Sequence, residues 1–194
     1  MALSSFFRLR QTGGAAGALY QAAVAQARRP EFYLSLGVAD TVDGRFDLLA
    51  LHAFLLLHRL GEIGRDAKGL SQEVFDLMFA DMDANLREMG VSDLAVGGRV
   101  KTMAKAFYGR VSAYDAGLTR EDGLHDALLR NLYRGTSPGA AILDAMVDYT
   151  RASASLLAGQ AIEALRAGRV QFADPPALAG GTDRISSSPV GEHA

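Results

Sequence analysis

The chain has 194 residues, a length typical of one domain and sufficient to bury a core without disulfides or metals. Its net charge of −2 excludes the broad positive field that nucleic-acid binding requires, so we expect no recognition of nucleic-acid sequence. The absence of cysteine excludes disulfide scaffolds and thiolate metal sites, and it suits a reducing compartment.

Residues 1–15 are basic and contain a glycine pair that breaks regular structure. Arg8 and Arg10 are not balanced by any acidic residue before Glu31. We therefore predict a flexible basic leader, which resembles a transit peptide or a tether to an anionic membrane surface. The longest mostly apolar run, residues 46–57, is shorter than the roughly 20 residues that span a bilayer, and it predicts a buried core helix.

The first helix is predicted over residues 16–28. Its apolar residues recur at helical spacing and should face the core: Leu19, Tyr20, Ala23, Val24 and Ala27. Pro30 ends this helix, and a short turn that carries Phe32 and Tyr33 is expected after it.

Capping residues mark the next two helices. The second is expected to begin near Asp40, where Asp40 and Asp43 take the places of a capping box, and to end near Gly61. A loop should then reach residue 69. The third helix is expected to start at Ser71 and to end at Gly90, a glycine in the position that follows a C-cap.

The fourth helix is expected to begin at Asp93 and to carry a long apolar stripe, spaced by three or four positions: Val96, Val100, Met103, Phe107, Val111 and Tyr114. Gly97, Gly98 and Gly109 interrupt this helix, and each weakens it by roughly 0.5–1 kcal/mol relative to alanine. Glycines at these positions indicate close contacts with other helices or a kink.

Two further helical segments complete the predicted fold. Thr119 and Asp122 form a capping pair before a leucine-rich helix, and Ser137-Pro138 should cap a long segment that ends at Gly168. Residues 169–194 are rich in Pro, Gly and Ser and are predicted to form a disordered tail. We therefore predict an all-α fold, an irregular single-domain bundle of about six or seven helices that spans residues 16–168.

Motifs of catalytic and metal-binding proteins are incomplete in this chain. Residues 135–139 match the nucleophile elbow by letter, but Pro138 lacks the N–H that would donate to an oxyanion. The stretch from Asp81 begins like an EF-hand loop, yet Leu86 replaces the glycine of its turn. The His-Asp pair at 125–126 has no further ligand motif, and no phosphate-binding loop is present. We expect no catalytic residues, metal or cofactor, and a protein that is not an enzyme.

His52 lies inside an apolar helix, where it could serve as an axial haem ligand or as a core histidine whose nitrogens are hydrogen bonded. No second histidine pairs with it at helical spacing, because His58 is six positions away and falls on another face. The pattern favours a core histidine.

Two stretches combine dense charge with apolar residues. The first, residues 37–49, contains Asp40, Asp43, Arg45 and Asp47 directly before the apolar run. The second, residues 75–91, presents one apolar helical face: Phe75, Met78, Phe79, Met82, Leu86 and Met89. Charged and polar residues border this face on both sides: Asp76, Asp83 and Arg87 on one, Asp81, Asn85 and Glu88 on the other.

Together these stretches resemble the ubiquinol–cytochrome c chaperone family, the assembly factors for cytochrome b of the respiratory bc complex. The resemblance continues through residues 20–33, through Ala106-Phe107-Tyr108-Gly109-Arg110 and through Arg130-Asn131-Leu132-Tyr133, in consistent order over residues 15–150. It implies a non-enzymatic assembly chaperone whose client, the protein that it binds, is newly made apocytochrome b.

The charged and methionine-rich surface is the candidate site for this client. Its residues are Asp40, Asp43, Arg45, Asp76, Asp81, Asp83, Arg87, Glu88, Met78, Met82, Met89, Lys101, Lys105, Tyr108 and Arg110. Methionine suits clients that vary in shape because its side chain is flexible. The alternative is that the charged residues form internal salt bridges and that the methionines pack in the core. Lys101, Lys105 and Tyr108 share an outer face, which is either solvated or contacts a ribosome, a lipid or a partner.

The resemblance also implies other partners. Eukaryotic family members act with a small partner protein and near the ribosome, and peripheral membrane contact is expected from the leader. The residue composition favours a bacterial cytoplasmic protein at the inner membrane, with the matrix side of mitochondria as the alternative. From a different class, an isoprenoid- or quinone-binding helical protein remains the rival, and a pocket of several hundred Å³ lined by Leu, Phe and Met would favour it.

Overall fold

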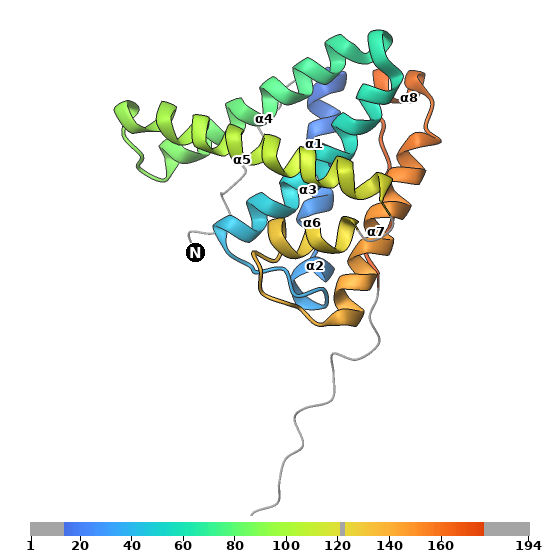
Figure 1. The fold of residues 1–194 in the computed structure, drawn as a ribbon. Coiled ribbons are helices and arrows are strands. Elements are labelled where there is room, and N and C mark those ends of the chain that lie inside the picture. The colour runs from blue at the N-terminus through green and yellow to red at the C-terminus, as the bar shows by residue number, and fades with distance from the viewer. Residues whose placement is uncertain (1–13, 121–122, 177–194) are drawn as a thin grey trace, which may run out of the picture.

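The computed structural model describes residues 14–120 and 123–176. In these ranges the chain forms helices and no strand (Figure 1). The helical elements are α1 (Ala15–Ala27), α2 (Glu31–Leu34), α3 (Val42–Ile63), the 3-10 segment η1 (Gly64–Ala67), α4 (Lys68–Glu88), α5 (Asp93–Thr119), α6 (Gly123–Asn131), α7 (Ala140–Ala158) and α8 (Ile162–Arg166). The prediction of an all-α bundle is confirmed.

Helix α3 is the centre of the fold. Residues 46–56 of this helix are all buried, because α1, α4, α5 and α7 pack around it. An apolar surface on every side suits this position, since a helix that is apolar all round must be covered by its neighbours. The run 46–57 is therefore a core helix, as predicted. None of the helices in the described ranges is both long and apolar enough to cross a membrane.

Helices α4 and α5 form an antiparallel pair whose joined ends project from the bundle (Figure 1). Gly90 follows the C-cap of α4 with a φ of 84°, which confirms the predicted C-terminal glycine. The predicted stripe on α5 is also confirmed, since Val96, Phe107 and Tyr114 are buried.

Several predicted helix ends are wrong by a few residues. Helix α3 is capped by Thr41, whose Oγ1 accepts a hydrogen bond from the Gly44 N–H at 3.1 Å, so Asp40 lies before the cap. The expected loop over residues 61–69 does not form, because α3 continues to Ile63 and η1 joins it to α4. The 3-10 turn keeps backbone groups bonded over this short connection.

The C-terminal helical segment also differs from its prediction. Helix α7 begins after Gly139, two residues beyond the expected Ser137-Pro138 start, and the Ser137 Oγ accepts only from the Gly139 N–H at 3.3 Å. The segment is divided into α7 and α8 at Gly159. Asp122 of the other predicted cap lies outside the described residues.

Residues 169–174 lie against the bundle without forming a helix. Phe172 is buried, and the Gln26 side chain donates a hydrogen bond to the Ala173 carbonyl at 2.8 Å. Arg29 holds Asp174 in an ion pair at 2.6 Å. A domain boundary after Gly168 therefore leaves out residues that contact the core, while the tail beyond residue 176 lies outside the described ranges.

The three glycines that were predicted to interrupt α5 do not mark close contacts with other helices. A methyl group on Gly97, Gly98 or Gly109 would have no neighbour within 4 Å. We therefore expect Gly98→Ala to raise the free energy of unfolding by about 0.5–1 kcal/mol, because alanine loses less backbone entropy on folding. Urea denaturation followed by circular dichroism measures this change.

Gly117 on the same helix provides the contrasting control. A methyl group there would lie 3.1 Å from the backbone of Gly123 at the start of α6. Gly117→Ala should therefore lower stability, since α5 and α6 would have to separate slightly. An equal gain in stability for both substitutions would contradict the close approach of these two helices.

Candidate functional site

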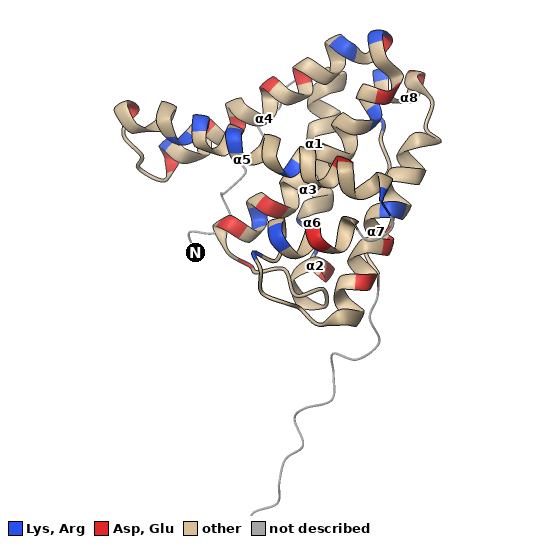
Figure 2. Cartoon of the chain, viewed as in Figure 1, with Lys and Arg blue, Asp and Glu red and all other residues tan. Residues whose placement is uncertain are grey.

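The first charged stretch joins the start of α3 to α5 and to the turn after α6. Asp47 is fully buried, and its two carboxylate oxygens accept hydrogen bonds from Arg110 and Arg134, each at 2.6 Å. Asp43 lies 3.2 Å from Arg134. Figure 2 shows acidic and basic residues side by side at this end of α3. Asp47 and Arg110 therefore form an internal salt bridge, which was the alternative to a client surface. Arg110 is held by Asp47 and does not project freely into solvent.

Opposing effects act on the Asp47 carboxyl. Burial raises its pKa, because the ionised form loses water, while the guanidinium groups of Arg134 and Arg110 lower it. Two charge-assisted hydrogen bonds of 2.6 Å hold it as a carboxylate at neutral pH.

Asp40 and Arg45 form a separate pair at the surface. The Arg45 Nε donates to the Asp40 carboxylate at 2.6 Å, and this hydrogen bond lowers the pKa of Asp40. The Asp40 side chain is 57% exposed, so the pair is screened by solvent and contributes little to stability. Asp40, Asp43 and Arg45 remain candidates for a charged contact.

The methionine-rich face of α4 lies mostly in the core. Met78 and Met82 are buried, so they do not belong to a surface for a client in this structure, whereas Met89 is exposed. The helical-wheel prediction placed the face correctly but not its depth, because α1 and α3 cover it.

The charged residues of α4 are placed on its two sides, as predicted. The Tyr20 hydroxyl of α1 donates to Asp81 at 2.8 Å, which fixes that carboxylate between helices. Arg87 pairs with Asp83 at 2.6 Å, as the i,i+4 spacing predicted, and also contacts Asp93. Two further candidates, Asp76 and Glu88, are exposed. The Asp83–Arg87–Asp93 group is a surface ion-pair cluster, and such clusters contribute little to stability.

Lys101, Lys105 and Tyr108 lie on the exposed side of α5, as the sequence predicted. Tyr108 is 57% exposed although its ring is in contact with the rings of Phe75 and Phe107, at centroid separations of 5.7 and 6.2 Å. Helices α4 and α5 therefore meet through aromatic side chains, and part of this aromatic group reaches the surface.

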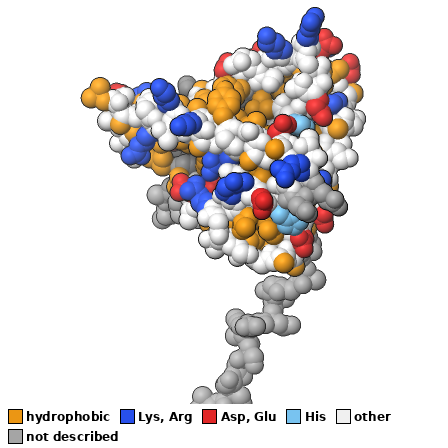
Figure 3. Space-filling model, in the orientation of Figure 1, with side chains coloured by type: hydrophobic (Ala, Val, Ile, Leu, Met, Phe, Trp, Pro, Cys, Tyr) orange, Lys and Arg blue, Asp and Glu red, His pale blue; other side chains and the backbone are white. Residues whose placement is uncertain are grey.

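This aromatic group forms one end of an open groove of about 830 Å³ bounded by α3, η1, α4 and α5. The apolar residues that line it are Phe54, Leu57, Leu60, Phe75, Phe107, Tyr108 and Val111. Figure 3 shows hydrophobic side chains gathered in the hollow between α4 and α5. A concave apolar surface that stays open to solvent is suited to an apolar segment of another molecule.

The rim of the groove carries charges of both signs. Arg65 and Lys68 come from η1 and the start of α4, whereas Glu62 and Asp115 come from the end of α3 and from α5. His58 lies between the two acidic residues, 3.1 Å from Asp115 and 3.7 Å from Glu62. Glu62 also lies 3.6 Å from Arg59, so a bound segment would meet both positive and negative side chains at the rim.

The position of this groove was not predicted from the sequence. Tyr108 is the one lining residue that had been predicted to bind a client. The other lining residues had been assigned to the core or to a loop. Leu57, Arg65 and Gln72 approach one another only because η1 turns α4 back across α3. A partial signal was present in the spacing of Phe107 and Val111, which continues the apolar stripe of α5 towards the groove.

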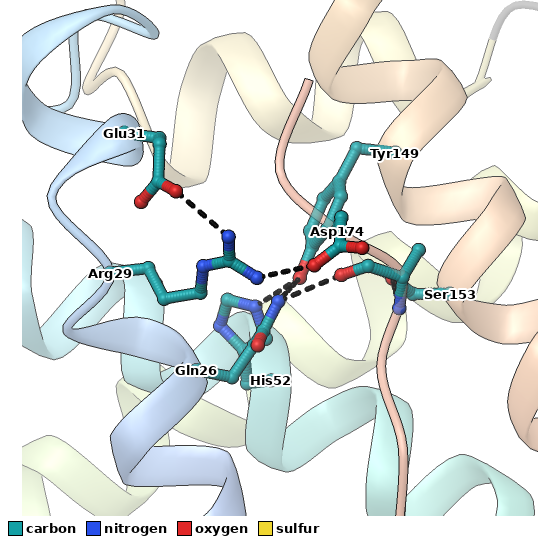
Figure 4. A network of polar contacts seen from close by, with 8 residues as sticks. Gln26, Arg29, Glu31, His52, Tyr149, Ser153 and Asp174 are labelled. Carbon is teal, nitrogen blue, oxygen red and sulfur yellow. Dashed lines mark hydrogen bonds and ion pairs between the residues drawn. The ribbon is translucent and has the colours of Figure 1, made fainter. Parts of the chain in front are cut away.

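A second polar group lies inside the bundle, where His52 is fully buried (Figure 4). Its Nδ1 lies 2.8 Å from the Leu48 carbonyl, which can only accept, so Nδ1 carries the proton. Nε2 then accepts from the Tyr149 hydroxyl at 2.7 Å, and Gln26 donates to the same hydroxyl oxygen at 3.0 Å.

Both ring nitrogens of His52 are thus hydrogen bonded to other residues of the protein. His52 is therefore a core histidine, as predicted, and neither nitrogen is free to bind haem iron. Burial lowers its pKa to about 4, because the charged imidazolium would lose its water. In the described ranges no three His, Asp or Glu side chains converge to hold a metal ion.

The chain is similar in sequence to a family of chaperones and to assembly factors of the ubiquinol-cytochrome c reductase complex. The family model for the ubiquinol-cytochrome C chaperone matches residues 34–172. The ubiquinol-cytochrome c reductase complex assembly factor 1 of Mus musculus is 28% identical over 134 residues, which cover 69% of this chain and 45% of the mouse protein. The corresponding protein of Xenopus laevis is 26% identical over 140 residues, which cover 72% and 70% of the two chains. This chain therefore spans less than half the length of the mouse relative.

A solved structure is also similar. The crystal structure of the Cbp3 homolog from Brucella abortus superimposes with a TM-score of 0.74 at 36% sequence identity, over 82% of this chain and 89% of that one.

Proposed function

Because the chain belongs to the ubiquinol-cytochrome C chaperone family, we propose that it binds newly made apocytochrome b and supports assembly of the cytochrome bc complex without catalysing a reaction. The observation that carries the proposal is the open apolar groove between α3, α4 and α5. Apocytochrome b has apolar segments that need cover before assembly, and this groove offers cover for one of them. The interaction takes place on the cytoplasmic side, beside the inner membrane.

The form of the groove supports a binding role that needs no nucleotide. Phe54, Leu60 and Phe107 are buried beneath it. The lining residues that still face solvent are apolar: Leu57, Phe75, Tyr108 and Val111. Their exposed surface gains free energy when an apolar partner buries it, at about 25 cal/mol per Å². The charged rim limits how a segment can lie, because a wrongly placed charge would face one of like sign. The groove therefore combines tolerance for apolar sequence with control of orientation.

An isoprenoid or quinone is the second candidate ligand, because about 830 Å³ lined by Phe and Leu would accept a lipid tail. The charged rim favours the protein segment. Mass spectrometry of organic extracts from the purified protein distinguishes the two. A stoichiometric isoprenoid would favour the lipid-binding function.

Tyr108→Glu provides the test of the groove. The substitution places a charge on the apolar lining, and burial of that charge against a client should reduce client capture about tenfold or more. In a strain that lacks the gene, the wild-type chain should restore b-type haem spectra and assembled bc complex, whereas Tyr108→Glu should not. Photo-crosslinking from position 71, which lines the groove, should label apocytochrome b only with the wild-type residue at 108.

Leu156→Glu is the matched control, because Leu156 on α7 is also a partly exposed apolar residue, at 39%, and it does not line the groove. This variant should restore assembly fully. Both proteins should keep their thermal stability within about 1 kcal/mol, as expected for surface changes. A normal level of assembled bc complex in the deletion strain would contradict the chaperone function. Full restoration of assembly by Tyr108→Glu would contradict the groove as the client site.

A further inference from the structure

The groove lies near the point where the N-terminal leader enters the fold. Gly168, after α8, is packed against Ala15 and Ala18 at the start of α1. Two residues before it, Arg166 donates a hydrogen bond to the Asp66 carbonyl of η1 at 2.9 Å. Asp66 is next to Arg65, which lines the groove. The start of α1 and the η1 end of the groove are therefore separated only by the end of α8.

The leader has the composition that the groove would accept. Its sequence Phe6-Phe7-Arg8-Leu9-Arg10 alternates bulky apolar residues with arginines and contains no acidic residue. Three apolar side chains match the Phe- and Leu-lined floor. The two guanidinium groups match the acidic lining residues Glu62 and Asp115, since carboxylates are the preferred partners of arginine.

We propose that the segment Phe6–Arg10 binds in the groove of its own chain and competes there with the client. The competition rests on the proposed function, whereas the docking itself does not. The segment acts as a substitute client that covers Phe75, Tyr108 and Val111 until a better ligand displaces it. This would protect an apolar surface that otherwise faces water.

The length of the leader permits this contact. Residues 6–14 span at most about 30 Å when extended, at 3.3–3.6 Å per residue. With Arg10 at the η1 end, Phe6 and Phe7 would reach the aromatic end. Because a short tether gives an effective concentration in the mM range, an intrinsic dissociation constant of about 1 mM suffices for half occupancy. A client of higher affinity would still displace the segment.

The chain contains no cysteine, so two introduced cysteines report the contact without ambiguity. Ser71 lines the groove one turn after η1, where the proposed register places Leu9, so Leu9→Cys with Ser71→Cys should form a disulfide within one chain under mild oxidation. Leu9→Cys with Ala167→Cys is the matched control, because Ala167 is exposed, lies next to Gly168, which packs against the start of α1, and does not line the groove. The first pair should react at least about tenfold faster, in line with a mM effective concentration.

Charge substitutions test the proposed register. Asp115→Lys should slow this disulfide, because it removes a partner of the arginines, whereas Lys68→Glu should accelerate it by removing a repulsive charge. Substitution of Phe6 and Phe7 by serine should reduce the rate to that of the control pair. Equal rates for the two cysteine pairs, or disulfides that link two chains, would overturn docking within the chain.

Competition is measured separately. Deletion of residues 1–12 should increase photo-crosslinking of apocytochrome b from position 71 about twofold or more, the gain expected when half of the sites were occupied. A fast disulfide with unchanged client capture would overturn the competition while the docking stands. If Tyr108→Glu leaves client capture intact while the disulfide forms, the proposed client site fails and the docking stands. Binding of the leader to anionic vesicles, with no preference for Ser71, would assign it to the membrane instead and overturn the docking.

Discussion

Substitution of Asp47 by alanine should lower the free energy of unfolding by about 3–5 kcal/mol, which makes it one of the most damaging single changes in this protein. Asp47 is fully buried, and Arg110 beside it is only 14% exposed. Without the carboxylate, Arg110 would keep its charge in a site where few water molecules can reach it. Arg134 is 48% exposed and can turn towards Asp43 or solvent, so the loss arises mainly at Arg110. Urea denaturation at neutral pH measures the effect.

Asp40→Ala is the control for this prediction. It also removes an aspartate that is 2.6 Å from an arginine in the same stretch, but Asp40 is 57% exposed, so the change should stay below about 1 kcal/mol. The double variant Asp47→Leu with Arg110→Met should recover much of the loss, because apolar residues can replace a buried pair without leaving a charge behind. Equal effects of Asp47→Ala and Asp40→Ala would show that burial does not distinguish the two pairs.

Stability should also fall by roughly 3 kcal/mol as the pH is lowered from above 6.5 to about 4, because of His52 alone. Burial holds the pKa of His52 at about 4 in the folded chain, against an ordinary value of 6.5. Between these values the unfolded chain binds a proton that the folded chain does not. The stabilisation is therefore complete above pH 6.5 and is lost as the pH falls towards 4.

His52→Gln should flatten this pH dependence. The glutamine amide can still donate to the Leu48 carbonyl or accept from Tyr149, but it does not titrate. The variant should be less stable than the wild type at pH 7.5, because the ring contacts of His52 with Phe32 and Phe172 are lost, and the two curves should converge towards acid pH. Leu156→Gln is the control, since this surface change removes and adds no titratable group, and its curve should run parallel to the wild type. A parallel curve for His52→Gln would contradict a neutral, buried His52.

The order and character of the helices could be predicted because they depend on local sequence. The apolar stripe of α5, the face of α1 and the buried α3 follow from the spacing of apolar residues, which sets the side of a helix that meets the core. Gly90 ends α4 for an equally local reason, its left-handed backbone. The same level of information supported the family resemblance, since it rests on short runs of residues in consistent order.

The site itself was decided by tertiary structure. Asp47 finds Arg110 and Arg134 at separations of 63 and 87 residues, and no local spacing indicates which arginine will meet a given aspartate. A helical wheel shows that Met78 and Met82 face one way, but only the arrival of α1 and α3 places them in the core. The groove depends on the turn at η1, which brings α4 back over α3 and leaves an apolar hollow beside α5. The sequence by itself therefore determined which surfaces are apolar, because that is a property of each helix. Only the packing of helices distant in sequence decided which of those surfaces are buried and which one remains open.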